Sequence, residues 1–392
     1  MAGKNAPKKK DIEKEGKEGT KAWFMKNIIL PNNEIIDKPG YIVSKYVGKG
    51  TRCYVREVLF PEKVLAVIES EAATRLGDAG RKAVYAAGKM WGVRYGITTG
   101  LPKKSGMPQK DFLEFLGSFM KFMESEYALK AAFMLDYQKD NFVTRYKDLM
   151  VCRLNGHGYF LLGTMNGAWQ HMSAKETEGI HTECQGRKDD ECVIECAPLG
   201  NLSDKSKAFS VKVPKDLGLE KEYFTLNTIK KAQYARNSLL DLLKGRIMRY
   251  EGGFFECNGD RFLLNEASSV YFLEQCLGKT KKGEEILFNA AFNYFRKLAQ
   301  GNSSTRMAQD FLPALGWGDI TVDASGNRAF CRNYPWTGYW KGSTFPILRG
   351  MLSGIASAHA NKGIMFNKVE ATISSGSLDI VMHGDKAAAK NI

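Results

Sequence analysis

The stretch GIHTECQGRKDDECVIECAP, residues 179–198, decides the fold of the first half of the chain. Two strand-like runs, residues 179–184 and 191–196, flank the polar segment QGRKDD, whose residues are typical of a tight turn. The pattern predicts a β-hairpin. Because a hairpin pairs its two strands side by side, Cys184 and Cys192 are expected to lie on adjacent strands.

A glycine-bearing helix is predicted just before this hairpin. The run NGHGYFLLGTMNGAWQHM carries Gly163 and Gly167 on one helix face, where a neighbouring backbone can approach closely. The second half shows the same order of elements, because PILRGMLSGIASAHA carries Gly350 and Gly354 in the same spacing. Two predicted strands follow it, over residues 368–373 and 378–382. The repeat is inferred from the order of elements, because the two segments share few identical residues.

Helical periodicity precedes each glycine-bearing helix. Residues 112–137 carry an aromatic stripe that includes Phe115, Phe119 and Phe122. A helix face turned to the core is the favoured interpretation of the stripe, and the wall of a ligand cavity is an alternative that does not exclude it. Further helices are predicted over residues 61–72, 79–95, 267–277, 284–299 and 305–315, and strands over residues 254–264, 320–322 and 328–331.

The chain length implies two folded modules. With 392 residues the chain is too long for one ordinary core, and its 44% of hydrophobic residues can fill two. We predict an α+β protein of two tandem modules, each a helical layer packed on a small antiparallel sheet. The expected division is a disordered lysine-rich tail (1–20), a first module (21–198), a linker (199–224), a connecting helix (225–244) with the second module up to residue 384, and a disordered tail (385–392).

The net charge of +14 bears on partners. Six lysines lie in the first 20 residues, but acidic residues are interleaved with them, so a solvated tail is the favoured interpretation. Binding of nucleic acid or of a ribosome through this tail is the alternative. No apolar run approaches the roughly 18 residues of a membrane span, and the N-terminal residues lack the apolar stretch of a secretory signal. A soluble, cytoplasmic protein is therefore expected.

The hairpin and the glycine-bearing helix together resemble the closing segment of 4-vinyl-reductase domains. In that family, a strand ending in Glu-x-x-Cys, a tight turn and a second Cys form the final hairpin; here the run is GIHTECQGRKDDECVIECAP. ALGWGDITV and EATISSGSLDIVM in the second half look like another copy. The resemblance covers residues 52–198 and 254–384. It implies helices against a small antiparallel sheet, an apolar pocket between them and frequent dimerisation, in a fold shared with aromatic-responsive sensor modules and Golgi tethering subunits.

A zinc site is predicted at this hairpin. Two thiolates on adjacent strands suit tetrahedral zinc if two further ligands converge. The resemblance implies that a Glu three residues before the first Cys and an upstream Cys complete the site. This chain has His181 at the Glu position, and Cys152 is the candidate for the fourth ligand beside Cys184 and Cys192, although His157 and Cys196 also come into question. Buried free thiols with an ordinary strand histidine remain the alternative.

Two groups of aromatic residues are candidates for a ligand pocket. In the second half, a short loop contains Trp336, Tyr339, Trp340 and Phe345. These side chains line the mouth of a pocket or a protein interface; the alternative is that they form the edge of a packed core. The group expected to line the equivalent pocket of the first half is Phe115, Phe119, Phe122, Tyr159 and Trp169.

The motifs of common enzyme classes do not occur in the sequence. It has no Walker-type phosphate loop, His-Glu-x-x-His motif, nucleophile elbow or dinucleotide fingerprint. The absence of these motifs argues against an enzyme, and the resemblance implies a protein that binds a small apolar or aromatic molecule as a sensor, with a structural zinc in its first module. A scaffold or tether that acts through a protein partner or a homodimer, a nucleic-acid-associated protein and an enzyme acting on a tetrapyrrole are the alternatives, in that order.

Overall fold

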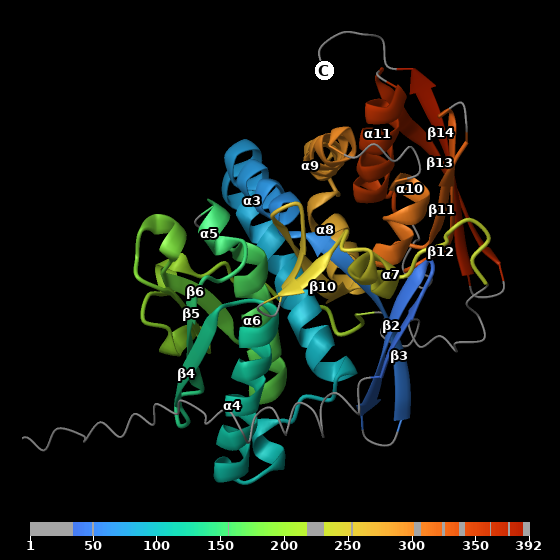
Figure 1. Cartoon of the computed structure of the whole chain (residues 1–392). Coiled ribbons are helices and arrows are strands. Elements are labelled where there is room, and N and C mark those ends of the chain that lie inside the picture. Colours follow the sequence, from blue (N-terminus) through green and yellow to red (C-terminus); the bar gives the residue numbers. More distant parts are fainter. Residues whose placement is uncertain are drawn as a thin grey trace, which may run out of the picture.

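The protein is an α+β fold in which antiparallel sheets pack against helices (Figure 1). The computed structural model describes residues 34–48, 51–155, 157–217, 231–251, 254–301, 307–323, 326–336, 342–360, 362–374 and 377–386. The fold class predicted from the sequence is confirmed. The lysine-rich tail over residues 1–20 lies outside the described residues, so the interpretations placed on it stay predictions.

The first half begins with three strands and continues with helices and two hairpins. Its elements are β1 (Glu34–Lys38), β2 (Tyr41–Gly48), β3 (Thr51–Pro61), α3 (Glu62–Thr98), α4 (Gln109–Glu126), β4 (Lys130–Asp136), β5 (Asn141–Lys147), α5 (Cys152–Asn155), α6 (Tyr159–Ser173), β6 (Glu178–Glu183) and β7 (Cys192–Ala197).

The second half follows the same plan after a short helix. Its elements are α7 (Leu239–Lys244), β8 (Arg249–Glu251), β9 (Phe254–Cys257), β10 (Asp260–Glu266), α8 (Ala267–Leu277), α9 (Lys281–Gln300), α10 (Met307–Asp310), β11 (Asp319–Val322), β12 (Arg328–Tyr334), α11 (Pro346–Ala360), β13 (Ile364–Ser374) and β14 (Ser377–Lys386).

Each half contains a four-stranded antiparallel sheet with the same connectivity. The strand order is β4-β5-β7-β6 in the first half and β11-β12-β14-β13 in the second. In both, a hairpin is followed by the glycine-bearing helix and then by a second hairpin, whose last strand lies in the interior of the sheet. The repeat inferred from the order of elements is therefore confirmed at the level of topology.

A third sheet joins the two halves, which the sequence analysis did not predict. It has six strands in the order β1-β2-β3-β10-β9-β8, so three strands come from each half. Its central pair is antiparallel and symmetric about Leu59 and Leu264, which face each other. To one side Phe60 pairs with Leu263, and to the other Val58 pairs with Asn265. Outward from this central pair the strands follow the order β3-β2-β1 on one side and β10-β9-β8 on the other, so both halves build the sheet in the same order.

Glycines allow the closest helix contacts in both halves. Helix α6 lies against α3, and a Cβ atom on Gly163 or Gly167 would come within 2.2 Å of a backbone oxygen of α3. Helix α11 lies against α9 in the same way, where a Cβ atom on Gly350 would lie 2.4 Å from the carbonyl oxygen of Phe288. The close backbone approach predicted from the glycine spacing is confirmed.

One predicted helix boundary in the first half was wrong, and one predicted helix break was confirmed. The helices expected over residues 61–72 and 79–95 are the two parts of α3, which meet at a kink where Gly77 has a non-helical backbone with φ +59°. The helix expected over residues 112–137 ends at Glu126, because residues 130–136 pair with β5 as strand β4. Pairing with the next strand of the same hairpin has overridden the helical pattern there.

The connecting helix expected over residues 225–244 was wrong over residues 231–238, where the described chain is not helical, and α7 begins at Leu239. The Asp319 carboxylate accepts the N–H groups of Gln233, Tyr234 and Ala235, which holds this segment in a non-helical conformation. Ser238 then starts α7 with a capping box. Residues 218–230 lie outside the described part.

The second half contains two smaller departures from the predicted boundaries. The helix predicted over residues 305–315 is interrupted, because α10 ends at Asp310 and a separate single turn starts at Pro313, which lacks the N–H that a continuing helix needs. Residues 385–386, placed in the disordered tail, belong to β14.

The linker predicted from residue 199 onward lies on the first half as far as residue 217. Lys89 Nζ donates to the carbonyl oxygen of Val211, and the Val211 N–H donates to the Glu178 carboxylate. Phe209 contacts the rings of Tyr85 and Tyr159. We call residues 203–213 the strap. The exact limits of the two modules stay predictions.

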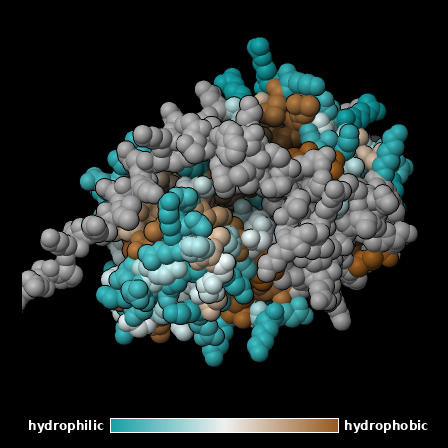
Figure 2. Space-filling view, turned by 90° about the horizontal axis from the view of Figure 1, so that it is seen from below, coloured by the Kyte–Doolittle hydropathy of each residue, from teal (hydrophilic) through white to brown (hydrophobic). Residues whose placement is uncertain are grey.

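One face of the molecule is largely hydrophilic where it is described. Figure 2 shows one face on which hydrophilic side chains dominate the described part and the hydrophobic patches are small and separate. Among the described residues, no helix is both long enough and apolar enough to cross a membrane.

Candidate metal centre and neighbouring cavity

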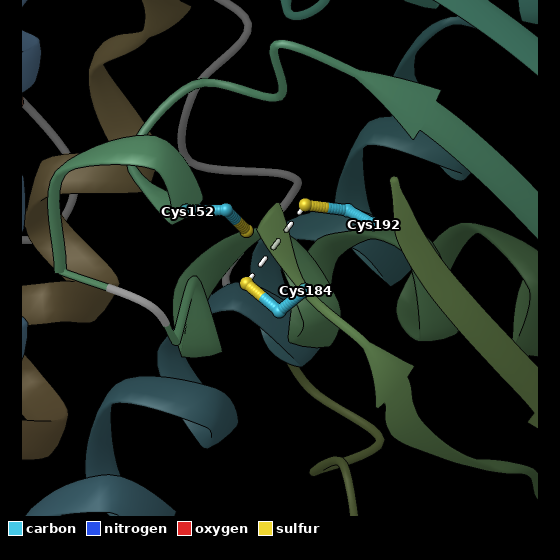
Figure 3. Close-up of side chains that lie close together, drawn as sticks. All are labelled: Cys152, Cys184 and Cys192. Atoms are coloured by element: carbon cyan, nitrogen blue, oxygen red, sulfur yellow. Dashed lines mark hydrogen bonds between the residues drawn. The ribbon is translucent and has the colours of Figure 1, made fainter. Parts of the chain in front are cut away.

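Three buried cysteines from separate elements meet in the first half. Cys152 opens α5, Cys184 follows β6 and Cys192 opens β7, and their sulfur atoms all lie within 4.8 Å of one another. Figure 3 shows the three side chains pointing toward one another. The Cys184 and Cys192 Sγ atoms are 3.8 Å apart, too far for a disulfide bond. All seven cysteines whose side chains are described are free thiols.

The hairpin turn fixes the positions of two of these cysteines. The Asp189 carboxylate accepts the N–H of Cys184 at 2.7 Å, and the N–H of Gln185 donates to Cys192 Sγ at 3.4 Å. A register shift in the β6–β7 pairing lies between His181 and Glu183, just before Cys184. These contacts turn both sulfur atoms inward, so the polar run QGRKDD positions the cluster as well as closing the hairpin.

The electrostatics of the cluster favour a negatively charged sulfur. The pKa of Cys184 is lowered because the thiols of Cys152 and Cys192 donate hydrogen bonds to its sulfur. The pKa of Cys152 is raised by its hydrogen bonds to Cys184 and Cys192, which favour its protonated form. Burial lowers the pKa of His181 to about 4, so its imidazole is neutral at pH 7 and can act as a ligand.

The geometry suits a tetrahedral metal ion bound mainly by sulfur. Zn–S bonds of about 2.3 Å at tetrahedral angles place two sulfurs roughly 3.8 Å apart, which is the distance between Cys184 and Cys192. His181 Nε2 lies 3.9 Å from Cys152 Sγ, but it is not within 4.8 Å of all three sulfurs. The three buried sulfurs could therefore hold a metal ion, and His181 beside Cys152 is the candidate for a fourth ligand.

Of the candidates for the upstream ligand, the structure brings Cys152 to the site and not the other two. The His157 ring stacks on Tyr159, and its Nδ1 lies 3.1 Å from the Tyr159 hydroxyl. Cys196 lies further along β7, beside Gly179, and burial raises the pKa of its thiol. Neither belongs to the group of converging sulfurs.

Gly158 is a site residue that the sequence analysis missed. It has φ +64°, and a Cβ atom there would lie 2.4 Å from Cys152 Sγ. The sequence offered a hint, because Gly158 belongs to the glycine-rich run before α6. Only the three-dimensional structure shows that it faces the Cys152 sulfur.

We expect Gly158→Ala to displace the Cys152 sulfur and to weaken metal binding roughly 10–100-fold, as loss of outer contacts does at other metal sites. Competition with a coloured zinc chelator measures the effect. Gly259→Ala is the matched control, because Gly259 also has a positive φ of +78° but faces open space. Equal affinities for the two variants would contradict the role of Gly158.

A cavity of about 790 Å³ adjoins the cluster. It lies between the kinked part of α3, the start of α6, the β6–β7 hairpin and the strap. His181 lines it, so the cluster and the cavity share a side chain. Its other lining residues are Asp78, Ala79, Arg81, Lys82, Tyr159, Leu162, Thr182, Arg187, Asp189, Ser206, Lys207, Ala208 and Phe209.

A buried polar network anchors the strap beside this cavity. Lys89 Nζ donates to Glu178 Oε1 at 2.9 Å and to the Val211 carbonyl at 2.6 Å. The Tyr85 hydroxyl donates to Glu178 Oε2 at 2.6 Å and accepts from Asn166. Burial lowers the pKa of Lys89, while the charge of Glu178 opposes that shift. The network therefore holds the cavity wall through charge-assisted hydrogen bonds.

The predicted ligand residues of the first half fall into two places. Tyr159 lines the cavity. Trp169 is fully buried, stacks on Phe142 at 4.8 Å and donates its indole N–H to the Asp140 carbonyl. The stripe of α4 faces the core, as its favoured interpretation predicted: Phe119 is buried, and Phe115 and Phe122 pack against the core. A ligand-binding role for these residues stays a prediction.

The predicted ligand residues of the second half lie in a closed aromatic group where they are described. Trp336 and Phe345 are buried and stack 5.7 Å apart, and Tyr334 meets both edge-on. The Trp336 indole N–H donates to the Ala267 carbonyl. Tyr339 and Trp340 lie outside the described residues. Trp336 and Phe345 therefore belong to the edge of a packed core, which was one of the two interpretations of this loop.

Glu274 makes the stability of the second half dependent on pH. Burial raises its pKa to about 8, against hydrogen bonds from the Ile347 N–H and the Ser343 hydroxyl. Because the pKa of Glu274 is higher in the folded than in the unfolded protein, its protonated form favours the folded state. This contribution to the free energy of unfolding is complete below the ordinary pKa of a carboxyl and is lost as the pH rises through about 8. We expect Glu274→Gln to flatten this loss, on the order of a few kcal/mol between pH 5 and 9. Urea unfolding at both pH values measures it, and parallel wild-type and variant curves would contradict it.

Comparisons with known proteins leave the family open. No protein-family model matches the sequence, and no curated protein matches it. The crystal structure of the phenol-responsive sensory domain of the transcription activator PoxR with phenol is a structural match at 18% identity and a TM-score of 0.37, covering 48% of this chain and 94% of that one. The resemblance to 4-vinyl-reductase domains stays a prediction.

Proposed function

We propose that the protein is a non-enzymatic small-molecule-binding regulatory protein whose binding cavity is stapled by a zinc ion. The observation that carries the proposal is that three buried cysteine sulfurs converge beside the cavity. His181, the candidate fourth ligand, also lines this cavity. Zinc would be held by Cys152, Cys184, Cys192 and the His181 imidazole. A site with four protein ligands has no open position for substrate, which is the pattern of structural zinc.

The cavity supports the binding part of the proposal. Its volume of about 790 Å³ falls in the range of small-molecule sites, about 300–1,000 Å³. Metal binding would fix the hairpin that forms one wall, since Cys184 and Cys192 flank the turn that contributes Arg187 and Asp189. The ion would thus keep the cavity in its binding shape before a ligand arrives, which lowers the ordering cost of binding.

Native mass spectrometry of the full chain, with metal analysis on the same sample, tests the proposal. We expect about one zinc per chain and a further mass shift, removed by mild denaturation, from a bound small molecule. Cys196→Ala is the control that should keep the metal. Protein purified from zinc-supplemented medium without metal would refute the zinc staple. A chain that carries no small molecule and binds none from a fragment library would refute the binding function.

The second half favours a different role, contact with a protein partner. The aromatic side chains that were candidates for a ligand pocket pack on one another instead, since the ring centroids of Tyr334, Trp336 and Phe345 lie 5.0–5.7 Å apart. Cross-linking of the full chain in its native extract, followed by identification of peptides joined to residues of the second half, tests this candidate.

A further inference from the structure

The charges that line the cavity are unbalanced. Four cationic side chains face two carboxylates, and both carboxylates are already engaged. Asp78 accepts from Arg81 Nη1 at 2.6 Å, and Asp189 accepts the N–H of Cys184 at 2.7 Å. The cavity therefore has few carboxylate oxygens left to bind a cationic ligand, and a surplus of positive charge.

Among the described residues, two of the four cations have no acidic partner. Arg81 pairs with Asp78, and Lys207 lies 3.5 Å from Asp204. In the part of the chain that the structure describes, neither Lys82 nor Arg187 has a carboxylate within 4.0 Å. They come from α3 and from the hairpin turn, so they reach the cavity from two different elements. An anion between them would gain two charge-assisted contacts.

The rest of the wall is aromatic and aliphatic. The Tyr159 and Phe209 rings meet edge to face with centroids 5.7 Å apart, and both are partly exposed. Leu162, Ala79 and Ala208 add aliphatic surface. Aromatic edges and faces of this kind favour a planar ring as the neighbouring group.

We infer that the cavity binds a small aromatic carboxylate, with its ring against Tyr159 and Phe209 and its carboxylate facing Lys82 and Arg187. The inference rests on the proposed function, because it names the ligand class of the same cavity. Guanidinium and carboxylate groups form paired hydrogen bonds, which gives Arg187 the larger share of recognition. The apolar wall distinguishes such a ligand from an inorganic anion.

Isothermal titration of the full-length protein tests the inference with three probes: benzoate, its neutral analogue benzamide, and inorganic phosphate. We expect benzoate to bind roughly tenfold more tightly than benzamide, and its affinity to fall with added salt. Arg187→Gln and Lys82→Gln should each weaken benzoate binding roughly five- to tenfold. Lys282→Gln is the matched control, since it removes one exposed cation of α9 away from the cavity lining.

The other outcomes separate the inference from the proposed function. If benzamide binds as tightly as benzoate and the charge variants change nothing, the cavity takes neutral ligands: the inference falls and the binding function stands. If phosphate matches benzoate and Phe209→Ala has no effect on either, the site is a plain anion site and the aromatic part falls. If none of the three probes binds, the inference falls, and the mass-spectrometric test decides the proposed function by itself.

Discussion

Replacing Cys184 by alanine is expected to release the metal and to lower the melting temperature by roughly 5–15 °C. Cys184 supplies the sulfur that the other two thiols hydrogen-bond, so its loss removes both a ligand and the charge that favours a cation. Chelation of the wild-type protein should give the same shift. Differential scanning calorimetry with zinc analysis measures both, and the absorption of a cobalt-loaded sample reports the thiolate bonds directly.

A matched cysteine separates metal loss from loss of packing. Cys196 lies on β7 in the same hairpin and is as buried as Cys184, but it is outside the sulfur cluster. Cys196→Ala should therefore keep its metal and lose only about 1 kcal/mol from the small cavity it leaves. His181→Ala should weaken metal binding without abolishing it, since three sulfurs remain. The staple is ruled out if Cys184→Ala and Cys196→Ala melt alike and chelation changes neither.

Replacing Lys89 by methionine is expected to destabilise the first half by about 3–5 kcal/mol. The Glu178 carboxylate would stay buried without its ion-pair partner, and the Val211 carbonyl would lose its donor. Because that carbonyl belongs to the strap, the strap should become accessible to protease well before the whole chain unfolds. Urea unfolding and limited proteolysis, with mass mapping of the first cuts, measure the two effects.

Two further variants test the cause of this loss. Lys82→Met removes an exposed lysine from the same helix, so stability should change by less than about 0.5 kcal/mol. Adding Glu178→Gln to Lys89→Met removes the uncompensated charge and should restore part of the lost stability. If Lys89→Met and Lys82→Met are equally mild and the strap stays resistant to protease, the network does not hold the cavity wall.

What could be predicted from the sequence was mostly local in the chain. The hairpin over residues 179–196 and the glycine spacing of α6 are short-range patterns, and both were confirmed. Cys184 and Cys192 were found for the same reason. Cys152 could only be named as one of three candidates, since its meeting with the hairpin depends on the backbone turn at Gly158.

Features made by distant segments could not be predicted. The cavity needs Arg81 from α3, Arg187 from the hairpin and Phe209 from the strap, which are more than twenty residues apart in each case. The six-stranded sheet pairs β3 with β10, some two hundred residues later. The non-helical segment before α7 depends on one distant carboxylate, Asp319. Each of these features depends on which distant segment a residue contacts, and the local periodicity of the sequence carries no information on such contacts.

The symmetric pairing of β3 with β10 has a consequence for dose response. Two separate identical subunits would carry two identical sites, and any mutation would alter both. Fusion frees the copies to diverge: the first half holds the sulfur cluster, while the second has Ala371 and Asp379 in the corresponding strands. If the proposed binding function holds and the cavity of the first half is the ligand site, one site per chain would give a hyperbolic saturation curve with a Hill coefficient of one. The protein would then respond to ligand concentration in a graded manner, and the second half would be free for another role.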